Sequence, residues 1–193
     1  MTIPDVNILV YAYNKDAKQH KVAREWWERT LTQPQSVGLP WITILGFIRI
    51  STQRRIIERP MFPHQAIERV RSWLDLPNVQ IISPGEAHGQ ILFRLIEDVG
   101  TAGDLTTDAH LAALAIEHRA QLVSTDADFA RFRRLQLAGP DMLIDGYDQY
   151  NQQENEIVNI SPEDGSEEPA EALPRADDCM SSHLLVHFLS SLG

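Results

Sequence analysis

The sequence predicts an α/β fold with a mostly parallel central sheet, joined to an acidic C-terminal tail. Up to about residue 144, short apolar runs of strand length alternate with segments of helical periodicity, the pattern of parallel βαβ units. Residues 150–193, in contrast, hold 1 Lys or Arg against 9 Asp and Glu. We therefore expect a domain at residues 1–146 and a disordered acidic extension at residues 147–193, which buries too little apolar surface to order itself.

The N-terminal half predicts two strands and three helices. They are strands at residues 2–5 and 37–39 and helices at residues 6–13, 20–31 and 40–52. Helical spacing predicts that Val22, Trp26 and Trp27 face the core from the second of these helices. In the third helix we expect the apolar residues to be core rather than ligand surface; they are Ile42, Leu45, Phe47 and Ile48.

The second half continues the alternation. It predicts helices at residues 63–76, 86–99 and 106–116, buried strands at residues 79–82 and 121–124, and an edge strand from residues 135–137 and 142–144 around a Gly-Pro turn. Pro63 favours the first position of its helix, where a missing N–H costs nothing. Thr106 or Thr107 is a candidate cap for the Ala/Leu-rich helix that follows it.

Three carboxylates are expected at one edge of this sheet. Asp5 ends the first strand, Asp126 follows the strand at residues 121–124, and Asp108 lies at the start of a helix. Strand ends and helix starts converge at the edge where open α/β sheets bind their ligands. Crowded carboxylates need large pKa shifts or a compensating cation, and Mg²⁺ or Mn²⁺ prefers oxygen ligands of this kind.

The segments around these residues resemble the PIN-domain nucleases and, more narrowly, the VapC toxins of bacterial toxin–antitoxin pairs. The motifs are DVN at residues 5–7, TDAHLAALA at residues 107–115 and STDADF at residues 124–129. The resemblance implies a three-layer α/β/α nuclease that cuts RNA, with Asp5, Asp108 and Asp126 as catalytic residues that bind Mg²⁺ or Mn²⁺. Asp128 is a further candidate metal ligand. The resemblance also implies a VapB-type antitoxin as partner and assembly into a homodimer.

One position departs from the family pattern. The family has a further Glu in the helix after the second strand, and Gly46 stands there in this chain. Three outcomes stay open: a nearby acid such as Asp128 or Asp104 takes the place of the Glu, water does, or the site is weakened. We expect that the site still works.

Other polar residues have structural explanations beside functional ones. His110 is a candidate general base, although a histidine beside an acid in a first helical turn is more often only hydrogen-bonded. Ser124 and Thr125 suit the orientation of carboxylates or water better than nucleophilic attack. Two arginine groups are either solvated surface or clamps for RNA phosphates; they are Arg49, Arg54, Arg55 and Arg59, and Arg131, Arg133 and Arg134.

Charge, cysteine content and the length of apolar runs limit the classes of protein to which this chain can belong. Residues 1–149 hold 16 Lys and Arg against 18 Asp and Glu, so the domain lacks the overall basic charge typical of nucleic-acid binders. The single cysteine, Cys179, excludes an intramolecular disulfide and fits a reducing compartment. No apolar run reaches the about 18 residues of a membrane helix. We expect a cytoplasmic protein with no membrane contact.

The sequence thus predicts a metal-dependent endoribonuclease toxin neutralised by a cognate antitoxin. One alternative is a PIN-like module that binds RNA or protein, disarmed at Gly46. A second is a phosphotransfer or receiver domain on a similar sheet. A protein of that class needs a lysine across the acidic pocket. No lysine follows Lys21 in this chain, so the nuclease interpretation is stronger.

Overall fold

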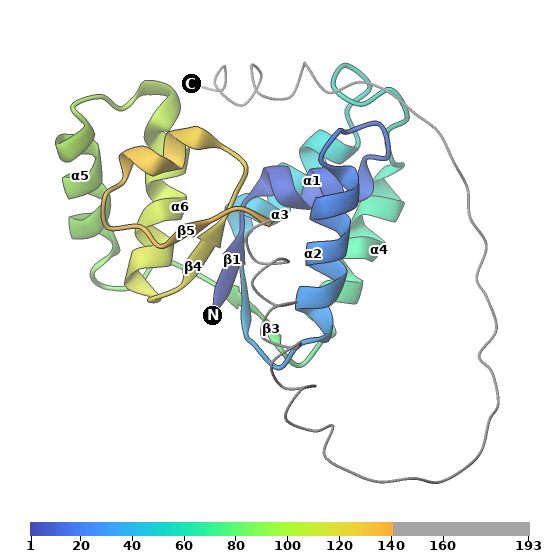
Figure 1. The fold of residues 1–193 in the computed structure, drawn as a ribbon, viewed down its shortest axis with the longest axis horizontal. Helices are drawn as coiled ribbons and strands as arrows, with labels where there is room; N and C mark the ends of the chain where they lie inside the picture. The colour runs from blue at the N-terminus through green and yellow to red at the C-terminus, as the bar shows by residue number, and fades with distance from the viewer. Residues whose placement is uncertain (141–193) are drawn as a thin grey trace, which may run out of the picture.

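The computed structural model describes residues 1–140, which form a parallel sheet between two groups of helices (Figure 1). The strands are β1 (Thr2–Pro4), β2 (Val37–Pro40), β3 (Val79–Ile82), β4 (Gln121–Val123) and β5 (Leu137–Ala138). Their order in the sheet is β3-β2-β1-β4-β5, and each neighbouring pair is parallel. The prediction of a mostly parallel α/β sheet is confirmed.

Six α-helices and two 3₁₀ turns connect the described strands. The helices are α1 (Val6–Tyr13), α2 (His20–Thr32), α3 (Trp41–Ser51), α4 (Pro63–Leu74), α5 (His88–Val99) and α6 (Thr106–Glu117). The 3₁₀ turns are η1 (Gly103–Leu105) and η2 (Ala127–Arg131). In Figure 1, α1 to α4 lie on one side of the sheet and α5 and α6 on the other, which gives the expected three layers.

Two hydrophobic cores fill the spaces between these layers. The core under α1 to α4 is rich in aromatic residues: Trp27 meets Trp73 edge-on at 5.3 Å between ring centroids, and Phe47 lies 4.8 Å from the same ring. The core under α5 and α6 is built mainly from the alanines and leucines of α6. Small side chains let α6 pack closely against the sheet through its buried residues in the range 109–115.

Several predicted burial positions are wrong. Leu45 is 59% exposed although helical spacing predicts it in the core, while Phe47 on the same helix is fully buried. In α2 the buried partner of Trp26 and Trp27 is Ala23, and Val22 is only half-buried. Periodicity identifies the helices correctly but fixes their rotation only to within about one residue.

The start of α6 also differs from the prediction. Both threonines lie inside the helix, and no side chain caps it. Thr106 instead donates a hydrogen bond of 2.8 Å to the carbonyl oxygen of Gly103, which ties η1 to the first turn.

Two expectations concern residues beyond the described part. The strand expected at residues 142–144 and the extension at residues 147–193 lie outside residues 1–140. Within residues 1–140, no helix has the length and apolar character needed to cross a membrane.

Candidate active site

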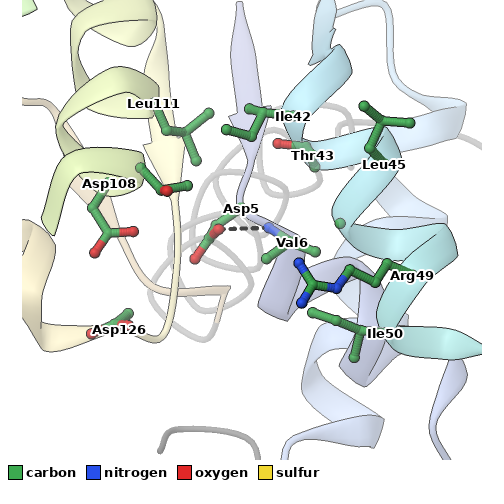
Figure 2. Close-up of a pocket in the computed structure, with 12 residues that line it drawn as sticks. Asp5, Val6, Ile42, Thr43, Leu45, Arg49, Ile50, Asp108, Leu111 and Asp126 are labelled. Carbon is green, nitrogen blue, oxygen red and sulfur yellow. Dashed lines mark hydrogen bonds between the residues drawn. The ribbon is translucent and has the colours of Figure 1, made fainter. Parts of the chain in front are cut away.

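A cavity of about 270 Å³ opens at the sheet edge where β1 and β4 end. Asp5, Asp108 and Asp126 lie on one side of it, and α3 forms the opposite side (Figure 2). β2 joins β1 on one flank and β4 joins it on the other, so this is the switch point where parallel sheets bind ligands. The three carboxylates predicted from sequence therefore do line one cavity.

Asp5 is fixed by its own local structure. It follows β1 and caps α1, with its Oδ1 accepting a hydrogen bond of 2.6 Å from the backbone N–H of Val6. The side chain is 6% exposed, and the backbone N–H of Asp5 donates to the carbonyl of Val123 on β4. The residue is thereby anchored to both central strands, and its Oδ2 is held by Ser124.

Ser124 joins the ends of the two central strands. Its hydroxyl donates to Asp5 Oδ2 at 2.7 Å, and its oxygen accepts from the Asn7 side-chain amide at 3.0 Å. The same oxygen accepts from the backbone N–H of Asp126 at 3.0 Å. One buried hydroxyl thus sets the orientation of Asp5 and the backbone position of Asp126.

Asp126 and Asp128 have different surroundings. Asp126 lines the cavity, and its Oδ1 accepts from the backbone N–H of Asp128 at 2.9 Å, in the Asx-type bend that begins η2. Asp128 does not line the cavity; its half-exposed side chain lies 3.7 Å from Arg131. Asp104, the other acid considered as a replacement for the family Glu, is exposed in η1 and also does not line it.

Asp108 enters the cavity from the third residue of α6. Its position near the positive end of the helix dipole favours the carboxylate form. Burial opposes this effect and, with repulsion from Asp5, Asp126 and Asp128, raises the pKa of Asp108 to about 7. Without a cation nearby, the negative charge of ionised Asp108 therefore has too little positive charge around it to balance it.

The same lack of compensation affects Asp5. Burial raises its pKa to about 6, although the hydrogen bonds from Ser124 and Val6 act in the opposite direction. Burial also raises the pKa of Tyr11, further along α1, while a hydrogen bond with Thr125 lowers it. Because a cation in the cavity would return the pKa values of both carboxyls toward normal, the acidic side has the electrostatics of a cation site.

The donor set fits a hard divalent ion, because the cavity supplies carboxylate oxygens and neither histidine nor cysteine lines it. Within residues 1–140, however, no three His, Cys, Asp or Glu side chains are already arranged to hold a metal ion. The carboxylates therefore share the cavity without forming a closed ligand cage.

The α3 side of the cavity is not evident from the sequence. Ile42, Leu45 and Ile50 line it, and Arg49 points across it toward the acidic side (Figure 2). Arg49 makes no ion pair with any described residue. Leu45 and Arg49 are four residues apart on one helical face, a spacing that signals a shared surface only once the neighbouring cavity is known.

Gly46 also lies on this side, and packing explains it. A Cβ added there would lie 2.8 Å from Cγ2 of Val6, closer than real side chains approach. Glycine therefore lets α3 pack against the first turn of α1. A glutamate at this position would force Val6 or the helix to move.

His110 of α6 is paired with a second histidine. The Nδ1 atom of His110 lies 3.0 Å from Nε2 of His88, a buried residue of α5. On its other side, His88 Nδ1 lies 3.5 Å from the carboxylate of Glu117. Burial and His88 lower the pKa of His110. Since His110 does not line the cavity, the structure assigns it to α5–α6 contact rather than to general-base catalysis.

Comparison with known proteins agrees with this architecture. The PIN domain family model matches residues 2–135. Among solved structures, the VapBC2 complex of Rickettsia felis bound to promoter DNA has a chain that superposes with a TM-score of 0.53 at 20% identity, covering 72% of this chain and 97% of that one. FitAcB from Neisseria gonorrhoeae gives 0.53 at 18% identity, covering 72% and 98%. At these identities the likeness establishes the fold alone.

Sequence relatives are much more similar. Ribonuclease VapC37 of Mycobacterium tuberculosis is 40% identical over 144 residues, which cover 75% of this chain and 100% of the relative. Ribonuclease VapC33 of the same species is 41% identical over 140 residues, covering 72% and 98%. The acidic cavity at the switch point, the match to the PIN domain model and these full-length relatives lead to one conclusion: the chain belongs to the PIN-domain family, in its VapC group.

Proposed function

We propose that this protein is a metal-dependent endoribonuclease toxin that hydrolyses RNA phosphodiester bonds in the cytoplasm. The observation that carries the proposal is the convergence of three carboxylates from β1, β4 and α6 on one cavity, two of them with raised pKa values. The names of the relatives, each called a ribonuclease, support the choice of RNA as substrate.

Asp5, Asp108 and Asp126 are the proposed catalytic residues, and they would hold Mg²⁺ or Mn²⁺. Such an ion lowers the pKa of bound water and neutralises charge on the reacting phosphate. Ser124 positions Asp5 through its 2.7 Å hydrogen bond. Asp128 would contribute through its charge, from outside the cavity lining.

Arg49 supplies the only cationic side chain among the residues that line this cavity. It faces the carboxylates from α3, so it is suited to hold a non-bridging phosphate oxygen of the RNA strand. The residues beside it on α3, Ile42, Leu45 and Ile50, are apolar.

We also propose a cognate VapB-type antitoxin and a homodimer as the assembly. Solved structures with the same fold include toxin–antitoxin complexes, which supports the first partner. A cationic antitoxin side chain in the acidic cavity would block cation binding by direct charge pairing. In this proposal residues 1–146 are the nuclease domain and residues 147–193 are an extension.

The test is RNA cleavage by the purified full chain with Mg²⁺, Mn²⁺ or EDTA, alongside Asp108→Asn. We expect metal-dependent cleavage that falls at least about 100-fold in the variant, because a neutral amide is a poor ligand and leaves the cation charge uncompensated. Arg49→Gln, compared with Arg54→Gln, is expected to weaken RNA binding while metal binding is unchanged.

Folding and antitoxin content must be checked by circular dichroism and mass spectrometry. Equal cleavage by the parent and Asp108→Asn in nuclease-free preparations would refute the assignment. If the folded, antitoxin-free parent binds RNA but does not cleave it with either Mg²⁺ or Mn²⁺, the protein is instead a disarmed binding module.

A further inference from the structure

A second cavity lies on the same side of the sheet as α3 but is formed by other elements. It has a volume of about 260 Å³ and is bordered by the end of α1, the loop after it, α2 from His20 to Glu28, and α4 with the loop that leads into it. Figure 1 shows α1, α2 and α4 packed together around this region, and the Tyr13–Trp73 and Trp27–Trp73 ring contacts join the three helices. None of its lining residues borders the acidic cavity.

Positive charge dominates the lining of this second cavity. Lys15, Arg24 and Arg69 border it, against a single acid, Glu28. Glu28 is already paired with Arg24 at 2.8 Å. Among residues 1–140, Lys15 and Arg69 have no acidic partner, and Arg69 lies over the Tyr13 ring at 5.5 Å. Two uncompensated cations therefore face one partly enclosed space.

The helix that borders the cavity favours the same kind of ligand. Trp27 of this helix lines the cavity and is 1% exposed, so its indole ring is a buried neighbour of the space rather than a ligand in it. His20, the first residue of α2, also borders the cavity, so the positive end of a 13-residue helix dipole lies there. Two uncompensated cations beside a helix N-terminus favour an anion over a cation or an apolar ligand.

The position of the cavity suggests which anion. Asp5 caps the N-terminus of α1, and Tyr13 ends that helix beside the second cavity. The 8 residues of this helix place the two cavities about 12 Å apart along α1. A single RNA strand with one phosphate at the carboxylates could thus reach the second cavity with a phosphate a few nucleotides away.

We propose that this second cavity binds a backbone phosphate of the RNA strand, with Lys15 and Arg69 as its main ligands. The proposal rests on the proposed ribonuclease function, because it names a subsite for the same substrate. The subsite would set the register of the strand over the carboxylates without contacting the reacting bond, since phosphate contacts position a nucleic acid.

The experiment measures binding of a labelled single-stranded RNA to the full chain carrying Asp108→Asn, by fluorescence anisotropy over a range of salt concentrations. Adding Lys15→Gln with Arg69→Gln is expected to weaken binding roughly tenfold or more. It should also reduce the salt slope by about 0.7 for each phosphate that the protein no longer neutralises. The matched control adds Lys21→Gln with Arg71→Gln, which removes the same charge from α2 and α4 outside the cavity.

Equal affinity and salt slope in the two double variants would overturn the proposal. Arg69→Lys should restore most of the binding, and Lys15→Gln alone, in an exposed loop, provides a test if Arg69→Gln disturbs folding. Because binding is measured on an inactive background, absence of cleavage by the parent would refute the nuclease without deciding this subsite.

A second measurement separates RNA from free phosphate. In ¹⁵N-labelled protein, the Trp27 indole signal, assigned with Trp27→Phe, is expected to shift with the RNA oligonucleotide. Inorganic phosphate should shift it in the same direction at much higher concentration, and phosphate present beforehand should raise the RNA concentration needed to complete the RNA shift. A phosphate-induced shift that leaves the RNA titration unchanged would identify a site for a free anion and overturn the assignment to RNA.

Discussion

The two sides of the acidic cavity are built in different ways. The acidic side consists of one helix start and two strand ends, and the strand ends are tied together through the Ser124 hydroxyl and the bond from the Asp5 N–H to the Val123 carbonyl. The α3 side consists of a helix face whose position depends on how closely Gly46 packs against Val6. A short motif can therefore place ligands where the backbone fixes them, whereas an opposing surface depends on helix packing.

Of the variants that test this comparison, Ser124→Ala has the largest expected effect, because it disturbs the acidic side without removing a carboxylate. The variant leaves Asp5 Oδ2 without its donor and the Asn7 amide and Asp126 N–H without an acceptor. We expect metal affinity to fall about 10- to 100-fold, as for other partners of metal ligands. Isothermal titration with Mn²⁺ measures this, and Ser83→Ala, at an exposed position, is the control. Equal Mn²⁺ affinity in both variants would show that Ser124 is not needed to orient the site.

The next effect tests the α3 side. Gly46→Glu is expected to destabilise the protein by about 1–3 kcal/mol, because its Cβ would meet Val6 Cγ2 at 2.8 Å. Removing the obstacle with Val6→Ala in the same chain should recover part of this loss. Urea denaturation of the parent, both single variants and the double variant gives the coupling energy.

A coupling energy near zero would mean that Val6 is not what excludes a side chain from position 46. The double variant has a further use, because it adds a fourth carboxylate to the cavity. If its Mn²⁺ affinity exceeds that of Val6→Ala, the glycine limits metal binding in the natural chain; if not, three carboxylates suffice.

The smallest expected effect is on the pH dependence of stability, which the carboxylates on the acidic side of the cavity cause and the α3 side does not. Unfolded Asp carboxyls lose their protons near pH 3.8, whereas folded Asp5 and Asp108 keep theirs until about pH 6 and 7. In that interval the folded state binds more protons, so this contribution to stability falls as pH rises from about 4 to about 7. Asp108→Asn removes part of the repulsion and should stabilise the metal-free protein above about pH 7.

We expect that gain to be on the order of 1 kcal/mol after allowing for solvent screening of the partly exposed side chain. Thermal unfolding in EDTA at about pH 4.5 and about pH 8 measures it, and the gain should nearly disappear at the lower pH. Mg²⁺ should raise the melting temperature of the parent at the higher pH and that of Asp108→Asn much less. A gain independent of pH would mean that carboxylate repulsion does not cause it.

Much of the architecture is readable from local sequence. The helices are predicted by their period of 3.6 residues, which follows from backbone geometry, and the strands by short, continuous apolar runs, which are typical of strands buried on both faces. Asp5, Asp108 and Asp126 can be found because each sits at a strand end or helix start, and the topology of a parallel sheet brings such points to one edge. Ser124 is also recognisable as an orienting residue, although its three hydrogen bonds are not.

Other features need the folded chain. Leu45 is predicted in the core, yet it is exposed beside the cavity, because a helix of apolar residues does not reveal which side meets the sheet. The His88–His110 contact and the cavity lined by Lys15 and Arg69 join residues 22 and 54 positions apart. No local pattern links such residues.

The sequence by itself determined the parallel α/β class, the PIN family and which three acidic residues line the cavity, because these depend on residue order and strand ends. Only the tertiary structure decided that Gly46 reflects tight packing against Val6, that Asp128 lies outside the cavity lining, and that a second, basic cavity flanks the far end of α1. The physical reason is distance: a local pattern fixes the backbone within an element, whereas the space between side chains depends on how separate elements pack.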